Sequence, residues 1–161
     1  MYDYVSQELF DLAQTIAPID LAKVGIFGHS MGGHGALVIG LRNPLKFQSI
    51  SAFAPICNPI SVPWGQKALT GYLGADQSTW QQYDASQVLK SYTGPRRSIL
   101  VDQGAADNFL AQLRPETLKS TENAVINVRM QPEFDHSYYF ISSFIADHFE
   151  HHASNFKGKG N

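Results

Sequence analysis

The sequence predicts an α/β fold, with a mostly parallel sheet of about four strands and flanking helices. Short apolar runs alternate along the chain with longer segments whose apolar residues recur at helical spacing. Glycine and proline stand between these segments, where turns are needed. At 161 residues, of which 43% are hydrophobic, the chain is long enough to bury a core. Together these observations favour βαβ units.

The first part of the chain contains two predicted helices and two predicted strands. Residues 3–17 carry apolar side chains at helical spacing and predict an amphipathic helix. Residues 23–28 (KVGIFG) form a short apolar run closed by glycine, which indicates a buried strand. Residues 31–42 are rich in small side chains and predict a helix, and residues 47–53 predict the second strand.

The rest of the chain begins with an irregular segment. Residues 55–97 contain repeated proline and glycine, so they predict loops and short helices. Residues 108–122 are predicted to be helical in part, because Pro115 interrupts them. The remaining two strands and the final helix are predicted at residues 98–103, 124–130 and 137–152.

The most specific motif is Gly28-His29-Ser30-Met31-Gly32, a G-x-S-x-G between a predicted strand and a predicted helix. Such a turn is so tight that side chains two positions either side of the serine would collide, which explains the glycines. The turn lifts the hydroxyl above the sheet, and the backbone N–H of Met31 points toward a developing oxyanion. We therefore predict that Ser30 is a nucleophile. The alternative is a glycine-rich turn that binds an anion or only packs.

A serine nucleophile needs a histidine base, and in this topology the base comes last, after the acid. His136 stands in a loop after the fourth predicted strand and is the predicted base; the alternative is a capping or packing histidine. His29 is held inside the turn and cannot swing onto its neighbour, and we expect His34, one turn into the helix, to pack. The other histidines are predicted to lie near a solvated helix end: His148, His151 and His152.

The orienting acid is predicted to be Asp107, which follows the third strand in a loop that can reach His136. Asp102 lies inside that strand and is the fallback candidate, or else a structural acid that caps the loop. Asp84 lies in the irregular segment. Asp135 adjoins His136 in sequence, and adjacent side chains rarely orient one another.

Three further side chains are candidates for the site or for the core beside it. Trp64 and His29 are the candidate substrate contacts, although a tryptophan beside proline and glycine also serves as a packing plug. Cys57 follows an apolar run with no histidine near it in sequence. We therefore expect Cys57 to be a buried structural thiol.

Charge and cysteine content limit the partners and the compartment. A formal charge of −2 and the lack of a basic stripe argue against nucleic acid as a partner. No stretch approaches the roughly 18 apolar residues of a membrane span, so no membrane partner is expected. One cysteine permits no internal disulfide, and the first residues do not resemble a signal peptide, so we expect a cytoplasmic protein.

Four segments together resemble S-formylglutathione hydrolase, also called esterase D, a family of the α/β-hydrolase superfamily. They are GHSMGGHGAL, SAFAPICNPISVPWGQKALTGYLG, ILVDQGAADNFL and FDHSYYFI, and the similarity runs from about Met1 through His152. The resemblance implies a cytosolic thioesterase that hydrolyses S-formylglutathione to glutathione and formate in formaldehyde detoxification, with side activity on short-chain esters. It implies Ser30 as nucleophile, Asp107 as acid, His136 as base and Met31 as one oxyanion donor, with no metal and no cofactor.

The resemblance also shows two departures from the family. The stretch between Asp107 and His136 is shorter than usual, which would trim a surface helix around residues 113–123. The family's first strands, and the loop that gives a second oxyanion donor, have no counterpart in this sequence. We therefore expect the C-terminal portion of an α/β-hydrolase fold: a partial domain over 1–152, with 55–97 as an irregular insertion over the site, and a polar tail over 153–161.

A partial domain of this kind has consequences for assembly and activity. The strand at 23–28 becomes an apolar sheet edge, so we expect a homo-oligomer or association with an N-terminal half through that edge. Loss of one oxyanion donor costs about 10²–10³ in turnover, so activity of the chain alone is expected to be weak or absent. The alternatives are a general carboxylesterase or acyltransferase of the same fold, or a catalytically silent module with a structural or partner-binding role.

Overall fold

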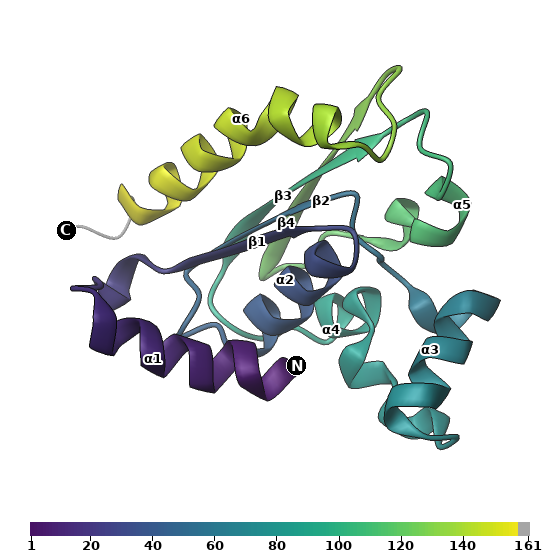
Figure 1. The fold of residues 1–161 in the computed structure, drawn as a ribbon, viewed down its shortest axis with the longest axis horizontal. Coiled ribbons are helices and arrows are strands. Elements are labelled where there is room, and N and C mark those ends of the chain that lie inside the picture. The colour runs from purple at the N-terminus through teal and green to yellow at the C-terminus, as the bar shows by residue number, and fades with distance from the viewer. Residues whose placement is uncertain (158–161) are drawn as a thin grey trace.

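The computed structural model describes residues 1–157 and contains a four-stranded sheet with helices on both faces (Figure 1). The strands are β1 (Gly25–His29), β2 (Ser49–Phe53), β3 (Arg97–Gly104) and β4 (Ala124–Gln131). They lie side by side in the order β1-β2-β3-β4, and every neighbouring pair is parallel. The predicted α/β class and parallel sheet are confirmed.

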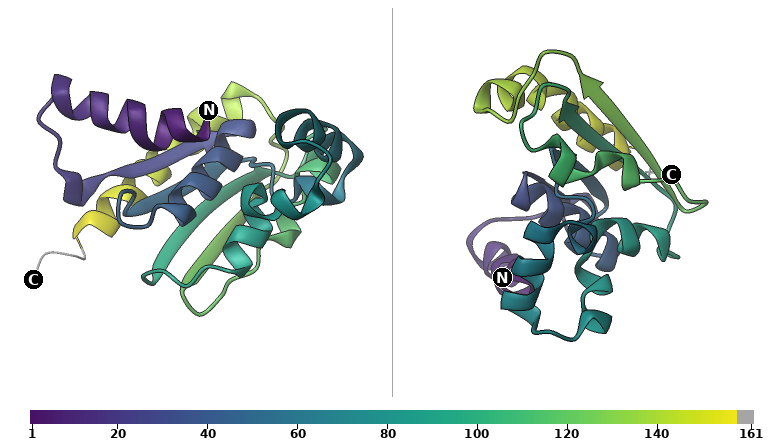
Figure 2. Two further views of the ribbon diagram at one scale, coloured as in Figure 1. Left: turned by 90° about the horizontal axis from the view of Figure 1, so that it is seen from below. Right: turned by 90° about the vertical axis from the view of Figure 1, so that its right-hand side faces the viewer.

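Helices cover the two faces of the sheet unequally. α2 (Met31–Arg42) and α4 (Ala85–Lys90) pack on one face, where α1 (Leu9–Ile16) also lies, after a π-helical turn at Tyr4–Glu8. Figure 2 shows that α6 (Tyr138–Lys157) crosses the opposite face. The helices α3 (Pro63–Leu73) and α5 (Leu110–Leu113) lie beyond the ends of the strands.

β2 shows why the two faces differ in chemistry. Ile50 and Ala52 point into an apolar core with residues of α2, such as Leu37. The alternate residues point toward α6, where Ser51 meets histidines and Phe53 packs on Phe140. The strand is buried on both faces, and its α6 face carries hydroxyl groups that need hydrogen-bond partners.

β1 is an edge strand of the described sheet, as predicted. It pairs with β2 on one side, and Phe27 stays 45% exposed next to Phe149, which is 58% exposed. α1 beside it contributes exposed Leu12 and Ile16. The described chain therefore leaves Phe27 and Phe149 exposed at the outer edge of the sheet, on the face that α6 covers.

Two predicted segments differ from the structure. Residues 55–97 contain a regular helix, α3, which begins at Pro63, a favoured first helical position. α6 continues to Lys157, past the predicted end at residue 152, because Asn155 donates to Ser49 Oγ and keeps the last turns on β2. The rest of the predicted tail, residues 158–161, lies outside the described residues. Within residues 1–157, no helix is both long and apolar enough to cross a membrane.

Candidate active site

Ser30 occupies a sharp turn between β1 and α2, as predicted. Its backbone has φ 58° and ψ −117°, a region that costs a non-glycine residue about 1–3 kcal/mol. The Ser30 N–H donates to the Phe53 carbonyl at 2.9 Å, and the Ser30 carbonyl accepts from the His34 N–H at 2.9 Å. The strained turn is therefore held from β2 on one side and by the first turn of α2 on the other.

The two glycines of the motif that flank Ser30 differ in how much space a side chain would have. A Cβ on Gly28 would lie 2.4 Å from the Gly32 carbonyl oxygen, so no side chain fits there. A Cβ on Gly32, by contrast, would meet nothing within 4 Å in the described chain. The expected collision holds for Gly28 and is wrong for Gly32. Gly33 is the tighter helical position, since its Cβ would lie 3.0 Å from the Phe53 carbonyl oxygen.

His136 and Asp107 form a direct pair. His136 Nδ1 lies 2.6 Å from Asp107 Oδ2, and because a carboxylate only accepts, Nδ1 carries the proton. In the neutral ring, Nε2 then keeps its lone pair. Gln103 Nε2 donates to the same Asp107 oxygen at 2.9 Å, and the Phe109 N–H donates to the other at 2.8 Å. Both oxygens of the buried carboxylate are thus fixed.

The loops that carry these two residues are joined at their bases. The Ala105 N–H donates to the Gln131 carbonyl and the Ala106 N–H to the Phe134 carbonyl, both at 2.9 Å. Gly104 permits this approach, because a Cβ there would lie 2.4 Å from the Phe134 carbonyl oxygen. Sequence reasoning missed Gly104, although glycine at a strand end is a recognised sign of close backbone approach.

Ser30 and His136 line one cavity of about 250 Å³. Met31, whose backbone opens α2, also lines this cavity, as does the half-exposed Trp64. The remaining walls, which sequence reasoning did not single out, are Ile56, Phe109, Gln112 and Leu113. The cavity therefore joins a hydroxyl, an imidazole and a helix N-terminus to mostly apolar walls.

His29 is placed differently from its prediction as a substrate contact. It is not among the residues that line the cavity in the described chain. Its ring packs against His136 instead, with ring centroids 4.3 Å apart. Burial lowers the pKa of His29, and the neighbouring His136 lowers it further, while Asp107 acts in the opposite direction.

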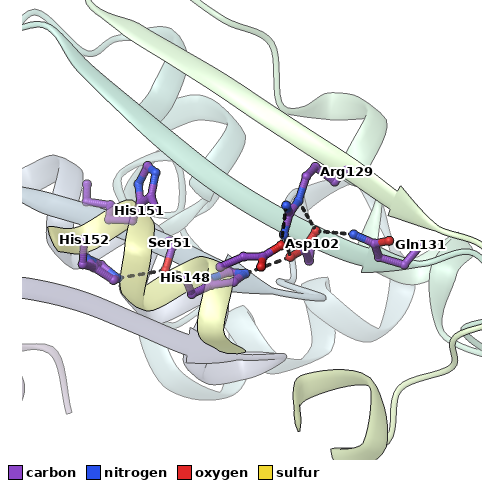
Figure 3. Close-up of polar contacts among 9 residues, drawn as sticks. Ser51, Asp102, Arg129, Gln131, His148, His151 and His152 are labelled. Atoms are coloured by element: carbon purple, nitrogen blue, oxygen red, sulfur yellow. Dashed lines mark hydrogen bonds and ion pairs between the residues drawn. The ribbon is translucent and has the colours of Figure 1, made fainter. Parts of the chain in front are cut away.

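Asp102, the fallback acid, serves another part of the molecule. It is fully buried in β3 and accepts hydrogen bonds from Arg129, Gln131 and His148 rather than capping the loop that carries Asp107 (Figure 3). Burial by itself would raise the pKa of Asp102, but these hydrogen bonds outweigh it and hold the pKa at about 2. Asp102 is therefore an ionised structural acid beneath α6.

The histidines of α6 were predicted near a solvated end, and that prediction is wrong. His148 is fully buried, with Nε2 3.0 Å from Asp102 Oδ2 and Nδ1 2.8 Å from Ser51 Oγ. His152 is 7% exposed, and its Nε2 lies 2.9 Å from the same hydroxyl (Figure 3). His151 donates to the Ile50 carbonyl. These residues share the face of α6 that docks on β2, so the polar stripe faces the sheet.

Two other side chains lie as expected. His34 packs, with Nδ1 2.8 Å from the Ile56 carbonyl oxygen. Cys57 is a buried thiol, and burial raises its pKa far above the usual range, so it stays protonated. Among residues 1–157, no group of three His, Cys, Asp or Glu side chains is suited to a metal ion.

Comparisons with known proteins agree with this geometry. Residues 1–151 match the family described as putative esterase. The chain is 54% identical to S-formylglutathione hydrolase of Rattus norvegicus over 158 residues, which are 95% of this chain and 56% of the rat protein. The corresponding Arabidopsis thaliana protein is 49% identical over the same share. The structure of an S-formylglutathione hydrolase from Agrobacterium tumefaciens superposes with a TM-score of 0.89 at 46% identity, covering 97% of this chain and 57% of that one. The chain thus spans little more than half the length of these relatives.

Proposed function

The chain belongs to the putative esterase family, and from this premise we propose that it carries the catalytic residues of a serine hydrolase of thioesters and short-chain esters. One observation carries the proposal. Ser30 sits on a strained strand-to-helix turn and shares a cavity with His136, whose Nδ1 is held by Asp107. A hydroxyl that opens onto a cavity, an oriented imidazole and a buried carboxylate are the groups that acyl transfer needs.

In the proposed reaction, Ser30 Oγ attacks the thioester carbonyl carbon while His136 Nε2 takes the hydroxyl proton. Asp107 keeps Nδ1 protonated and stabilises the imidazolium. The Met31 N–H, at the start of α2, donates to the oxyanion. The C–S bond then breaks, His136 gives its proton to the departing thiolate, and an acyl-enzyme with an uncharged imidazole remains. Water that gives its proton to His136 attacks the acyl carbon, which releases the carboxylic acid and restores the Ser30 hydroxyl.

The substrate we propose is S-formylglutathione, giving glutathione and formate. Relatives at 49–54% identity bear the name S-formylglutathione hydrolase, which supports this choice. A cavity of about 250 Å³ is suited to a short acyl group. A thiolate is also a good leaving group, so the reaction asks little of a general acid. The predicted cytoplasmic setting, where glutathione is abundant, remains part of this proposal.

We further propose that the open edge of β1 is where the chain associates with a polypeptide that corresponds to the unmatched part of its relatives. Phe27 and the neighbouring Phe149 are exposed at this edge, and α1 carries the exposed apolar side chains of Leu12 and Ile16. An unpaired edge strand also presents free backbone groups to a further strand. Pairing of two copies through the same edge is the competing outcome, and size-exclusion chromatography distinguishes a self-associated chain from a mixed complex.

A fluorophosphonate probe tests the proposed function, applied to the chain alone and after mixing with the unmatched part of the Agrobacterium tumefaciens relative. We expect peptide mapping to find the label on Ser30, and Asp107→Asn to slow labelling by about 10⁴, because the imidazole adopts the wrong tautomer. No labelling of Ser30 in either state would mean a catalytically silent module. Faster turnover of p-nitrophenyl acetate than of S-formylglutathione would instead favour a general carboxylesterase.

A further inference from the structure

The ring of His29 contacts the ring of His136, although the two residues are far apart in the sequence. Their centroids lie 4.3 Å apart with an angle of 45° between the planes. His29 ends β1 and directly precedes Ser30, whereas His136 comes from the loop after β4. The contact therefore joins the strand that carries the candidate nucleophile to the loop that carries the candidate base.

Within the described residues 1–157, His136 is otherwise held by one hydrogen bond and one further ring. Asp107 fixes its Nδ1, and Phe109 meets the ring edge-on with centroids 5.2 Å apart. A single hydrogen bond at Nδ1 leaves the ring free to tilt about that contact, and tilting moves Nε2. His29 and Phe109 are the aromatic neighbours that restrict this movement. Phe109 also forms a wall of the cavity, whereas His29 does not line it in the described chain.

We propose that His29 is a positioning residue for His136 in the reaction proposed above. Its uncharged ring packs against the base, keeps Nε2 directed toward Ser30, and leaves room for positive charge to develop on His136. This inference rests on the proposed function, because the orientation of His136 Nε2 affects the reaction only when Ser30 gives its proton to that nitrogen.

The surroundings of His29 favour its uncharged form. Its Nε2 is buried without a hydrogen-bond partner among residues 1–157. The charged or titratable groups that face it are His136, which opposes a positive charge, and Asp107, which favours one; burial opposes it most. His136 itself faces Asp107, His29 and the exposed Asp135. A cation at position 29 would repel the imidazolium that the reaction forms on His136.

Three substitutions separate positioning from simple packing. His29→Phe keeps an uncharged ring, and we expect its fluorophosphonate labelling rate to fall less than that of His29→Leu. His29→Leu fills similar space without a ring, and labelling should fall by roughly tenfold to a hundredfold, the cost of a displaced base. His29→Lys adds a positive charge and should lower the pKa of His136. The acidic limb of the labelling rate then moves to lower pH by about one unit or more.

A purely structural role for His29 predicts a different pattern. The Phe and Leu variants would then label equally once matched for thermal stability, and His29→Lys would leave the acidic limb in place. Either result overturns the inference. NMR titration of the His136 ring, assigned with His136→Gln, supplies a second readout that needs no activity. If Ser30 never labels, the proposed function fails, and an unchanged His136 pKa in His29→Lys then rejects the electrostatic contact as well.

Discussion

Removal of the Ser51 hydroxyl is the most direct test of how α6 is held on the sheet. Ser51 Oγ lies 2.8 Å from His148 Nδ1 and 2.9 Å from His152 Nε2. Because ionised Asp102 accepts from His148 Nε2, the uncharged tautomer that fits this contact has its lone pair at Nδ1. Ser51 therefore donates to His148 and accepts from His152. One hydroxyl satisfies two buried ring nitrogens.

Ser51→Ala leaves both nitrogens without a partner in a site closed to water. Each orphaned buried polar group costs about 1–3 kcal/mol, and the two share one network, so their costs are not fully additive. We expect the free energy of unfolding to fall by about 2–4 kcal/mol. Urea unfolding followed by circular dichroism measures this from the midpoint, provided that the slope with denaturant stays the same.

Ser143→Ala is the matched control. Ser143 lies on the exposed side of α6, where its hydroxyl donates to the Tyr139 carbonyl. Its loss should change the free energy of unfolding by no more than about 0.5 kcal/mol. If Ser51→Ala were as mild as Ser143→Ala, the two histidines would find other partners. The account of α6 as a helix docked through hydroxyl–imidazole bonds would then be wrong.

Three further predictions concern the turn, the loops and pH. Gly28→Ala should unfold the Ser30 turn and abolish labelling. Gly32→Ala adds a methyl group that meets no atom in the described chain, so it should stabilise α2 by up to about 1 kcal/mol. Thermal melts of the two variants test whether the first lowers and the second raises the melting temperature. Gly104→Ala should push the His136 loop outward and slow labelling, and an unchanged rate would contradict the close approach. The free energy of unfolding should fall as pH drops from 6.5 toward 4, because the unfolded chain binds more protons than the folded chain in that window. Equal urea midpoints at pH 6.5 and pH 4 would refute this prediction. The histidine pKa values lowered on folding, that of His152 to about 4, are those of His29, His34, His151 and His152.

Much of the fold could be predicted because buried parallel strands are continuous apolar runs with sharp ends. The predicted strand at 98–103, for example, corresponds to β3 at Arg97–Gly104. Short helices were predicted within residues 55–97, but the bounds of α3 were not, because Gly65 and Gly71 suggested a break. In the structure a Cβ on Gly65 would lie 2.1 Å from the Pro59 carbonyl oxygen. Gly65 is thus needed for close packing, a reason that depends on tertiary contacts.

The candidate site divides in the same way. The turn at Ser30 is local, so its motif predicted it, and chain order led to Asp107 and His136. The contribution of Gln103, which donates to Asp107 from inside β3, could not be predicted, because it depends on where two loops meet. The α6 histidines were misplaced because a polar helical stripe normally faces water. Here the opposing strand offers Ser51, and that pairing is visible only in three dimensions.

The molecule contains a second set of serine, histidine and aspartate, and comparing the two sets shows what reactivity requires. Ser51, His148 and Asp102 are joined by hydrogen bonds of 2.8 and 3.0 Å, yet all three are fully buried between α6 and the sheet. Ser30, by contrast, opens onto a cavity. A carbonyl or phosphorus centre cannot reach Ser51 unless α6 leaves the sheet. We therefore expect Ser30→Ala to abolish fluorophosphonate labelling under native conditions although the buried set stays intact. Mass spectrometry that finds label on Ser51 in that variant would show that α6 opens, and that access does not distinguish the two serines.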